Sequence, residues 1–463
     1  MTRSAIGKLA KSTIGFSWAV SLFALQRIEN TFALCRSSKR NDQEGAAFSS
    51  ITRAIERQFT RPIGEAFRAG DQLQRGMLDL MLSVATLEAL APKSIMKATL
   101  DVMQQSAQTL TFLVPGRESR VTWQELKNKL QAFELFEHVE SALQLPARAQ
   151  ITLTELVKRV GALNPYLALW AMEGVGHYYA ENYWERNGTP RKLLTGTEGS
   201  ALARSTLVPL HAGVGLSLAS RLLQRIKPKG RPAEVQEFIQ HFRMLCEDNS
   251  REGYAGVIFE ALGVVARTLF PHWIPTIHRY LSAIGGTLTD YFWHGVGRGI
   301  YFAPTNFLPW CSAPWRALAM SQREPPNESC RLNATAGLAF ALTLVNIQQP
   351  EVLETFLAHH GEDLSKNDAF SSGVSSALII WRYWTQEDVH FTAFREHQPC
   401  PCVPKVAALW RSQVKRPCED ALKHRYTLLA EHDRAEEMFR YVALPESAGR
   451  LTSTPPAEHS NRV

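Results

Sequence analysis

Trp170-Ala-Met-Glu-Gly-Val-Gly176, followed by His211-Ala-Gly-Val-Gly-Leu216, is the first of three similar pairs of segments in this chain. The second pair reads Ile258-Phe-Glu-Ala-Leu-Gly263 and Trp293-His-Gly-Val-Gly297, and a more divergent third pair reads Leu332-Asn-Ala-Thr-Ala-Gly337 and Ser372-Gly-Val-Ser-Ser376. Glu173 and Glu260 are 87 residues apart, and the corresponding glycines 213, 295 and 373 are 82 and 78 residues apart. A period near 80 residues (about the length of two helices with their connections) predicts an internally duplicated architecture.

The paired segments have helical rather than strand character. They are apolar, and we find no alternation of apolar and polar residues with a period of two anywhere in the chain. We therefore predict a mainly α fold of internally duplicated helical repeats at about 165–226, 254–303 and 332–381, with each repeat formed by two helices and their connection. An N-terminal helical region precedes the repeats.

Glycine inside an apolar helix costs roughly 0.5–1 kcal/mol relative to alanine. Its recurrence in every pair indicates that another group approaches these helices closely, because a glycine leaves room where a Cβ would stand. Two explanations stay open. The glycines either allow tight packing between helices or make room for a ligand.

The chain divides by composition into four regions. Residues 1–120 form the N-terminal helical region with an apolar and basic leader, and residues 121–385 form the helical repeat domain. Residues 386–444 are a C-terminal extension with a charged helix from Glu419 to Val442, and residues 445–463, rich in Pro, Ser and Thr, form a disordered tail. Two capping-box patterns, Thr122-Trp-Gln-Glu125 and Thr152-Leu-Thr-Glu155, predict helix starts at the beginning of the repeat domain.

Charge and cysteine content limit the classes of partner and location. The net charge is +7, but residues 1–40 hold seven basic residues against one acidic residue, so the rest of the chain is nearly neutral. This distribution argues against a nucleic-acid partner. Seven scattered cysteines are typical of a reducing compartment rather than of a disulfide framework. The mean hydropathy of −0.17 argues against a polytopic membrane protein, and we expect a cytoplasmic location.

The uncharged stretch at residues 12–26 follows a basic leader and is too short to cross a bilayer. It either docks on the rest of the protein or lies in an anionic membrane surface as an interfacial helix. A peripheral membrane contact is therefore one of two open interpretations.

The candidate site residues are the acidic and imidazole side chains of the paired segments: Glu173, His177, His211, Glu260 and His294. Glu173 and His177 lie four residues apart and share one helix face. Carboxylate and imidazole groups together can bind a divalent metal or act as an acid–base pair. The alternative is that the glutamates are buried and hydrogen-bonded to backbone or tyrosine groups. The reaction and any cofactor stay unknown.

Two further features have alternative explanations. His397, Cys400, Cys402 and Cys418 are ligand types for zinc, but their spacing matches no common zinc module, and we predict no metal site. Aromatic residues are frequent around the repeats. They either line an apolar pocket for a large ligand or belong to the core.

The repeat motifs also carry a resemblance. The segment from Tyr254-Ala-Gly-Val-Ile-Phe-Glu-Ala-Leu-Gly263 through His294-Gly-Val-Gly297 resembles a bacterial family of unknown function with members in enediyne polyketide biosynthesis clusters. Gly337-Leu-Ala-Phe-Ala-Leu-Thr-Leu-Val-Asn346 and Gly373-Val-Ser-Ser-Ala-Leu-Ile-Ile-Trp381 fit the same pattern, so the resemblance covers about residues 160–385. It implies an association with biosynthesis and carries over no catalytic residues.

Two functions follow from these observations. The first is a non-enzymatic helical-repeat accessory or scaffold protein of a bacterial biosynthetic system, which binds protein partners or a hydrophobic intermediate. The second is an enzyme, metal-dependent or not, with a Glu/His site between the repeats. The sequence does not specify an oligomeric state.

Overall fold

The computed structural model of the protein describes residues 117–137, 139–145, 151–226, 232–303, 306, 313–385, 388–400 and 404–444. All of them belong to one compact unit, Glu88–Val463. The predictions for the apolar stretch at 12–26, for nearly all of the N-terminal region and for the whole of the tail at 445–463 fall outside the described residues.

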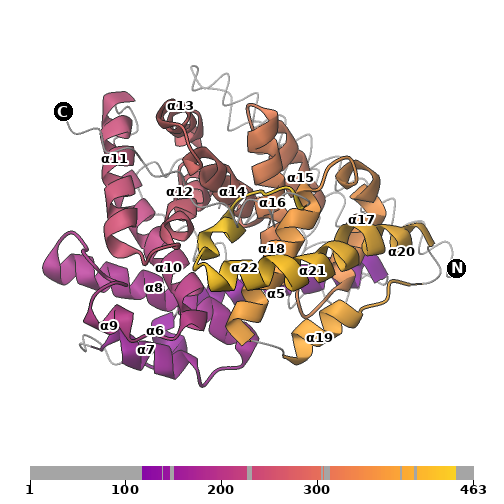
Figure 1. The fold of residues 1–463 in the computed structure, drawn as a ribbon, viewed down its shortest axis with the longest axis horizontal. Helices are drawn as coiled ribbons and strands as arrows, with labels where there is room; N and C mark the ends of the chain where they lie inside the picture. Colours follow the sequence, from indigo (N-terminus) through magenta and orange to yellow (C-terminus); the bar gives the residue numbers. More distant parts are fainter. Residues whose placement is uncertain are drawn as a thin grey trace, which may run out of the picture. The chain divides into compact units, whose positions relative to one another are not determined.

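Every regular element within these ranges is a helix, which confirms the mainly α prediction (Figure 1). Six long helices dominate: α8 (Pro165–Asn187), α10 (Arg204–Leu223), α12 (Ala255–Leu269), α14 (Leu288–Tyr301), α16 (Glu328–Val345) and α18 (Ala369–Thr385). The three segments that carry the sequence motifs correspond to the pairs α8/α10, α12/α14 and α16/α18.

Further helices connect the six and flank them. They are α5 (Arg117–Glu137), α6 (Val139–Ala142), α7 (Leu153–Val160), α9 (Thr197–Ser200), α11 (Pro232–Asn249), η1 (Pro271–Trp273), α13 (Ile274–Ile284), α15 (Ala313–Arg323), α17 (Glu351–Leu364) and α19 (Val389–Glu396). The C-terminal part contains α20 (Pro404–Trp410), η3 (Arg411–Lys415), α21 (Arg416–Asp420), η4 (Ala421–Arg425), α22 (Tyr426–Glu431) and η5 (Ala435–Phe439).

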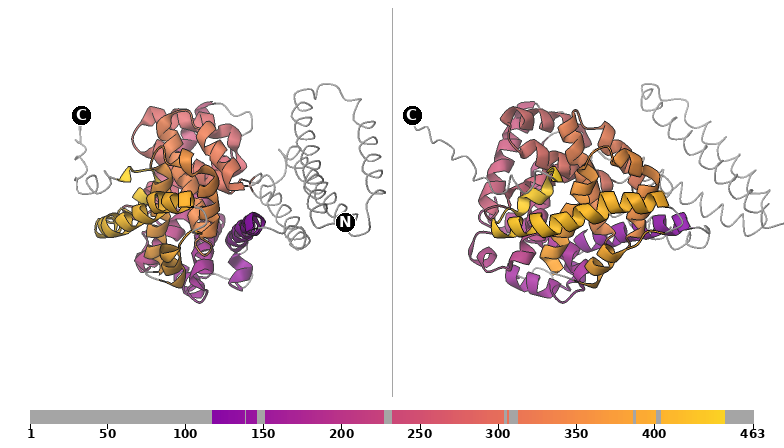
Figure 2. Two further views of the ribbon diagram at one scale, coloured as in Figure 1. Left: turned by 90° about the vertical axis from the view of Figure 1, so that its right-hand side faces the viewer. Right: turned by 45° about the vertical axis from the view of Figure 1, so that its right-hand side comes forward.

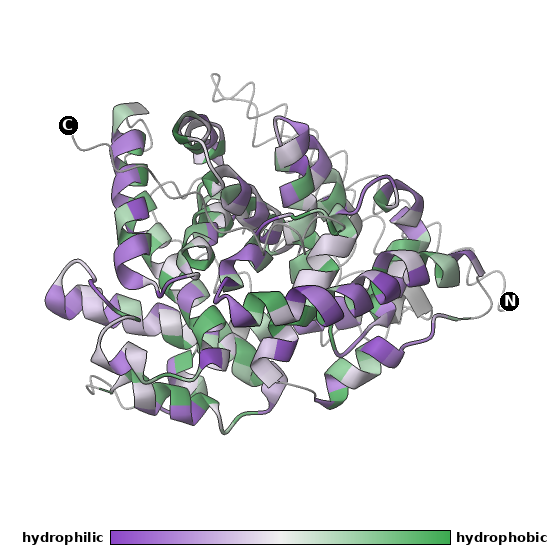
Figure 3. Ribbon diagram, viewed as in Figure 1, coloured by the Kyte–Doolittle hydropathy of each residue, from purple (hydrophilic) through white to green (hydrophobic). Residues whose placement is uncertain are grey.

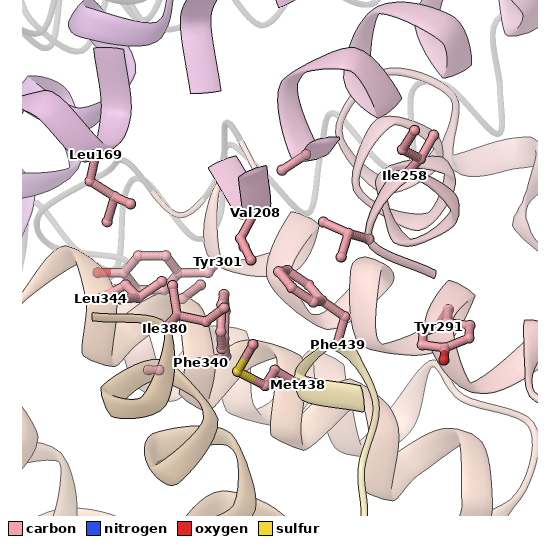
Figure 4. Packing of buried hydrophobic residues seen from close by; sticks show 14 of the residues in the cluster. Leu169, Val208, Ile258, Tyr291, Tyr301, Phe340, Leu344, Ile380, Met438 and Phe439 are labelled. Atoms are coloured by element: carbon pink, nitrogen blue, oxygen red, sulfur yellow. The ribbon is translucent and has the colours of Figure 1, made fainter. Parts of the chain in front are cut away.

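Each of the six long helices packs against the next one in the series, and α18 returns to contact α8 and α10. The indole N–H of Trp384 donates to the Pro165 carbonyl at 2.9 Å, which ties the end of α18 to the start of α8. The interior of this closed series is the hydrophobic core, and Figure 4 shows the convergence of apolar side chains there.

The motif glycines lie at contacts between these helices, as the packing explanation predicts. A Cβ on Gly213 of α10 would stand 1.9 Å from the Glu173 carbonyl oxygen of α8. A Cβ on Gly295 of α14 would stand 2.0 Å from the Glu260 carbonyl oxygen of α12, and one on Gly373 would stand 2.1 Å from that of Ala336. Real Cβ atoms do not approach so closely, so these positions accept only glycine without a backbone shift.

Helix α5 is joined to the core by a buried polar network. Lys129 pairs with Glu125 at 2.7 Å, and the Tyr301 hydroxyl donates to Glu125 at 2.6 Å. The Asn346 amide donates to the Tyr301 oxygen at 2.9 Å, so the network links α5 to α14 and α16. The predicted capping box at Thr122-Trp-Gln-Glu125 is therefore wrong. The helix begins at Arg117, and Glu125 is a buried ion-pair partner.

The second predicted capping box, Thr152-Leu-Thr-Glu155, is confirmed for its first residue, Thr152. Thr152 precedes α7 in an extended conformation, and its hydroxyl accepts a hydrogen bond from the Glu155 backbone N–H at 3.3 Å. The Glu155 carboxylate pairs with Arg159 instead of returning to Thr152.

The C-terminal extension lies against the helical array in both views of Figure 2. The helical run from Pro404 ends at Glu431, so the predicted helix from Glu419 to Val442 starts and ends too late. Figure 3 shows hydrophilic and hydrophobic residues mixed along α20–α22, as expected for helices that cover a core. Phe439 is buried, and the buried Arg425 donates to the Glu437 carbonyl at 2.6 Å.

Among the described residues, α10 is the one single helix long and apolar enough to cross a membrane, and 83% of its apolar window is buried in the structure. Ala255–Leu269 and Pro271–Ile284 pass the same test together but are bent by 119°. Burial of this kind is typical of core helices.

Candidate functional site

Helices α8, α12 and α14 bring four polar side chains together inside the core. Glu260 and His294 are fully buried, and Arg298 and Glu173 are 6% and 7% exposed. The glycines make this possible, because Gly263 and Gly295 let the backbones of α12 and α14 approach each other. His294 and Arg298 are four residues apart on α14 and both reach Glu260.

Arg298 is placed between the two glutamates. Its Nη1 donates to Glu260 Oε2 at 3.2 Å, and its Nη2 donates to Glu173 Oε1. Burial works against the guanidinium charge, but the two carboxylates outweigh it and raise the pKa of Arg298. Burial also raises the pKa of Glu173, although the charge of Arg298 opposes this shift. One positive charge thus faces two carboxylates in a region removed from solvent.

His294 contacts Glu260, and Arg298 contacts the other oxygen of the same carboxylate. Nδ1 of His294 lies 3.1 Å from Glu260 Oε1, and burial lowers the pKa of His294, so the ring is neutral at pH 7. Because an ionised carboxylate only accepts hydrogen bonds, the proton of the neutral ring is on Nδ1. Nε2 then carries a lone pair, and it has no hydrogen-bond partner among the described residues. The ring lies against Phe340 and Phe439, with centroids 5.5 and 6.1 Å away.

A cavity of about 120 Å³ lies beside the ion group. Its wall is mostly apolar, with side chains from α5, α8, α10, α12 and α14. Four aromatic residues take part: Phe133, Phe136, Trp170 and Phe302. The charged or titratable residues that the structure describes in this wall are Glu173, His177 and Arg298.

A second cavity, of about 30 Å³, adjoins the same group. Trp170, Glu173, Arg298 and Phe302 line both cavities, so the Glu173–Arg298 pair is between them. Six apolar residues of the smaller cavity are labelled in Figure 4: Leu169, Val208, Phe340, Leu344, Ile380 and Phe439.

One polar atom in the shared wall, a carboxylate oxygen of Glu173, lacks a hydrogen-bond partner among the described residues. Oε2 of Glu173 accepts no hydrogen bond from the described residues, since the one bond of this carboxylate runs from Arg298 to Oε1. The indole Nε1 of Trp170 is buried and lies close enough to Tyr166 to affect the pKa of that hydroxyl, but it has no acceptor at normal hydrogen-bond geometry among the described residues. A carboxylate oxygen beside a cavity can be satisfied by a donor group of a ligand.

The five predicted site residues fall into three groups. Glu173, Glu260 and His294 meet around Arg298, and the two carboxylates face each other across its guanidinium. His177 lines the larger cavity one turn beyond Glu173, and its ring contacts Phe136 edge-on, with the ring centroids 5.2 Å apart. The interpretation that the glutamates bond to backbone or tyrosine is wrong for this pair, because an arginine is their partner.

His211 does not belong to the site, which corrects the prediction. Its Nδ1 lies 2.6 Å from the Leu207 carbonyl oxygen, and its Nε2 accepts from the Arg251 backbone N–H at 3.1 Å. The ring stacks on Tyr254, and burial lowers the pKa of His211 to about 3. Both ring nitrogens are therefore used in hydrogen bonds to the backbone, and the bond from Nε2 holds the chain at Arg251.

Arg298 was not predicted, although it is the centre of the site. An arginine one turn after His294, directly behind the Gly-Val-Gly motif in an otherwise apolar helix, is the signal that identifies it. Phe439 was also missed, because nothing local in the sequence shows that the C-terminal segment reaches the core.

No group of three or more His, Cys, Asp or Glu side chains in the described part of the chain is arranged to hold a metal. Of the four zinc-type residues, His397 pairs with Glu354 at 3.1 Å, and Cys418 is a buried free thiol next to Ser375. Cys402 lies outside the described residues. Cys400 is disulfide-bonded, which differs from the expectation of reduced cysteines.

Comparisons with protein-family models, curated proteins and solved structures find no match to this chain. The properties of the site are therefore the basis for its function.

Proposed function

We propose that the protein binds a small hydrophobic molecule in the cavity beside Glu173 and Arg298, as a non-enzymatic accessory protein of a bacterial biosynthetic system. The resemblance of residues 160–385 to a family with members in enediyne polyketide clusters supports the biosynthetic setting. Of the two expected kinds of partner, a small molecule is favoured, because a mostly apolar cavity of about 120 Å³ suits a small molecule rather than a protein surface.

The observation that carries this proposal is the position of an incompletely satisfied ion group in the wall of an apolar cavity. Ligand sites combine mostly apolar walls with a few polar groups that fix orientation. A buried arginine with two carboxylates supplies such groups and does not contribute much stability compared with apolar packing. An engineered apolar cavity of about 150 Å³ is known to hold benzene, so the volume suits a single small ring.

Binding can be tested with indole as a probe by calorimetry and by ligand-observed NMR on the full-length protein. Leu216→Trp fills the larger cavity and should abolish binding. Leu167→Trp is the matched control, since Leu167 is also half-buried but lines neither cavity, and it should leave binding unchanged. Equal affinity in wild type and Leu216→Trp would place the bound probe elsewhere and contradict the proposal.

We also propose that the helix pairs α8/α10, α12/α14 and α16/α18 derive from one duplicated unit of about 80 residues. The equivalent contacts of Gly213 with the Glu173 carbonyl and of Gly295 with the Glu260 carbonyl support a common origin. The test is superposition of the three pairs. Unrelated crossing angles within the pairs would contradict duplication.

An enzymatic role is the second candidate, and one observation favours it. Glu260 holds His294 with a free Nε2 lone pair, which is the arrangement of a general base oriented by a carboxylate. The test is depletion of compounds from a bacterial metabolite extract, followed by mass spectrometry, with wild type and His294→Gln. Turnover by wild type alone would favour the enzyme, whereas stoichiometric retention by both proteins would favour the binding role.

A further inference from the structure

We propose that the larger cavity takes a small organic ammonium ion with a hydrophobic body, held by the Glu173 carboxylate and the aromatic side chains around it. This inference rests on the proposed binding function and specifies the class of ligand. It depends on three properties of the cavity: its charge, its free acceptor and its aromatic wall.

The charge balance favours a cation. Arg298 supplies one positive charge and contacts both Glu173 and Glu260, so the group is one positive charge short when both carboxylates are ionised. His294 is neutral, and among the described residues of the cavity wall His177 is the one titratable group besides Glu173 and Arg298. A bound ammonium ion would complete the balance, while a bound anion would add to the excess of negative charge.

The free acceptor is Oε2 of Glu173. The side chain is more than nine-tenths buried and lines the cavity, and Oε2 accepts no hydrogen bond from the described residues. An ammonium group has donors only, so it complements this oxygen. Burial raises the pKa of Glu173, as expected for a carboxylate that lacks a full set of partners.

The aromatic wall gives the second contact. Phe133, Phe136, Trp170 and Phe302 line the same space as Glu173. Aromatic faces attract ammonium groups, and the attraction is stronger where water is removed. The same rings accommodate the hydrophobic part of the ligand, so charge and apolar surface are recognised together.

Three ligands of similar shape and different charge test the proposal: benzylamine, benzyl alcohol and benzoate. Their affinities for the full-length protein are measured by calorimetry at pH 8, where benzylamine is mostly protonated and histidine, with an ordinary pKa near 6.5, is neutral. We expect benzylamine to bind at least about ten-fold more tightly than benzyl alcohol, and benzoate to bind most weakly.

Two variants locate the source of the preference. Glu173→Gln should reduce benzylamine affinity to that of benzyl alcohol while leaving benzyl alcohol nearly unchanged. Phe136→Leu keeps the cavity apolar but removes one ring, and it should weaken benzylamine several-fold more than benzyl alcohol. Phe136→Leu leaves the ion group intact, so it provides the answer if Glu173→Gln does not fold.

The outcomes separate this inference from the function on which it rests. Equal binding of benzylamine and benzyl alcohol, or tighter binding of benzoate, overturns the ammonium proposal and leaves the hydrophobic-ligand function standing. Absence of binding by all three compounds and by indole overturns both. A benzylamine preference that survives in both variants also overturns the proposal, because the charge would then be recognised elsewhere.

Discussion

Arg298 donates from Nη1 to Oε2 of Glu260 across 3.2 Å, and both side chains are buried in the middle of the six-helix array. This pair joins α14 to α12, and the second Nη of Arg298 extends the link to Glu173 on α8. The three helices that carry the candidate site are therefore connected by one guanidinium.

Replacement of Arg298 by methionine should lower the free energy of unfolding by about 3–5 kcal/mol, because it leaves two carboxylates buried without a counter-charge. The measurement is urea unfolding at pH 7. Arg331→Met is the control, since the Arg331 side chain is 42% exposed and pairs with an exposed Glu328, and a loss of about 0–1 kcal/mol is expected there. A loss below about 1 kcal/mol for Arg298→Met would show that the two carboxylates are not left buried and unpaired in the variant.

His211→Gln should make the protein less sensitive to acid. The folded-state pKa of His211 is about 3 against an ordinary 6.5, so the unfolded chain binds the proton first as pH falls. The contribution of the neutral ring to stability is complete above about pH 6.5 and is lost progressively toward pH 3, by up to a few kcal/mol at about 1.4 kcal/mol per pKa unit.

Glutamine can keep both hydrogen bonds of that ring, with the Leu207 carbonyl and the Arg251 N–H, but it does not titrate. The unfolding free energy of His211→Gln should therefore fall less than that of wild type between pH 7 and pH 4. His432→Gln, at an exposed position, should follow wild type. Parallel curves for wild type and His211→Gln would contradict the assignment.

Gly295→Ala should destabilise the protein by at least about 1–3 kcal/mol, because the added methyl would lie 2.0 Å from the Glu260 carbonyl oxygen and would force α12 and α14 apart. Gly213→Ala should behave alike against Glu173. Thermal unfolding measures both. Gly161→Ala is the control, because its nearest neighbour would be 3.3 Å away and its φ of −59° is open to alanine. A neutral shift at Gly295 would mean that the two helices are separated more widely than described.

The membrane interpretation of residues 12–26 is tested by co-sedimentation with liposomes, with and without anionic lipid. Full-length protein is compared with a chain that starts at Asn41. Each Lys or Arg near an anionic surface contributes roughly 1 kcal/mol, so the basic leader should give weak, salt-sensitive binding if it contacts the membrane. If both proteins stay in the supernatant at low salt, the membrane interpretation fails. Aggregation of the shorter chain would then indicate that the stretch packs on the protein.

Glu173, Glu260 and His294 were predictable, because charged or imidazole groups in apolar helical segments need a partner inside the core. The identity of that partner was not. Arg298 is 125 residues away from Glu173 in sequence, and no local pattern joins the two. His211 was predicted to belong to the site because of its position in the repeat motif. Its ring instead forms hydrogen bonds with the Leu207 carbonyl and the Arg251 backbone N–H.

The two capping-box patterns, Thr122-Trp-Gln-Glu125 and Thr152-Leu-Thr-Glu155, are alike in sequence but take different positions relative to their helices. Thr152 caps α7 because its own backbone is extended and the helix starts directly after it. Thr122 stands within α5 because the helix begins at Arg117, and its Glu125 is buried against Lys129 and Tyr301. The sequence pattern is the same, and the upstream conformation and the long-range partner make the difference.

The sequence alone determined the helical class, the main helices of the core and the glycines at which they touch. These features follow from composition and from apolar segments interrupted by glycine, which act over a few residues. Only the tertiary structure decided that one arginine joins two glutamates and that an aromatic cavity lies beside them. It also decided that Nε2 of His294 has no hydrogen-bond partner among the described residues. Those features depend on how helices far apart in the chain pack and on the space left between them, which no local pattern encodes.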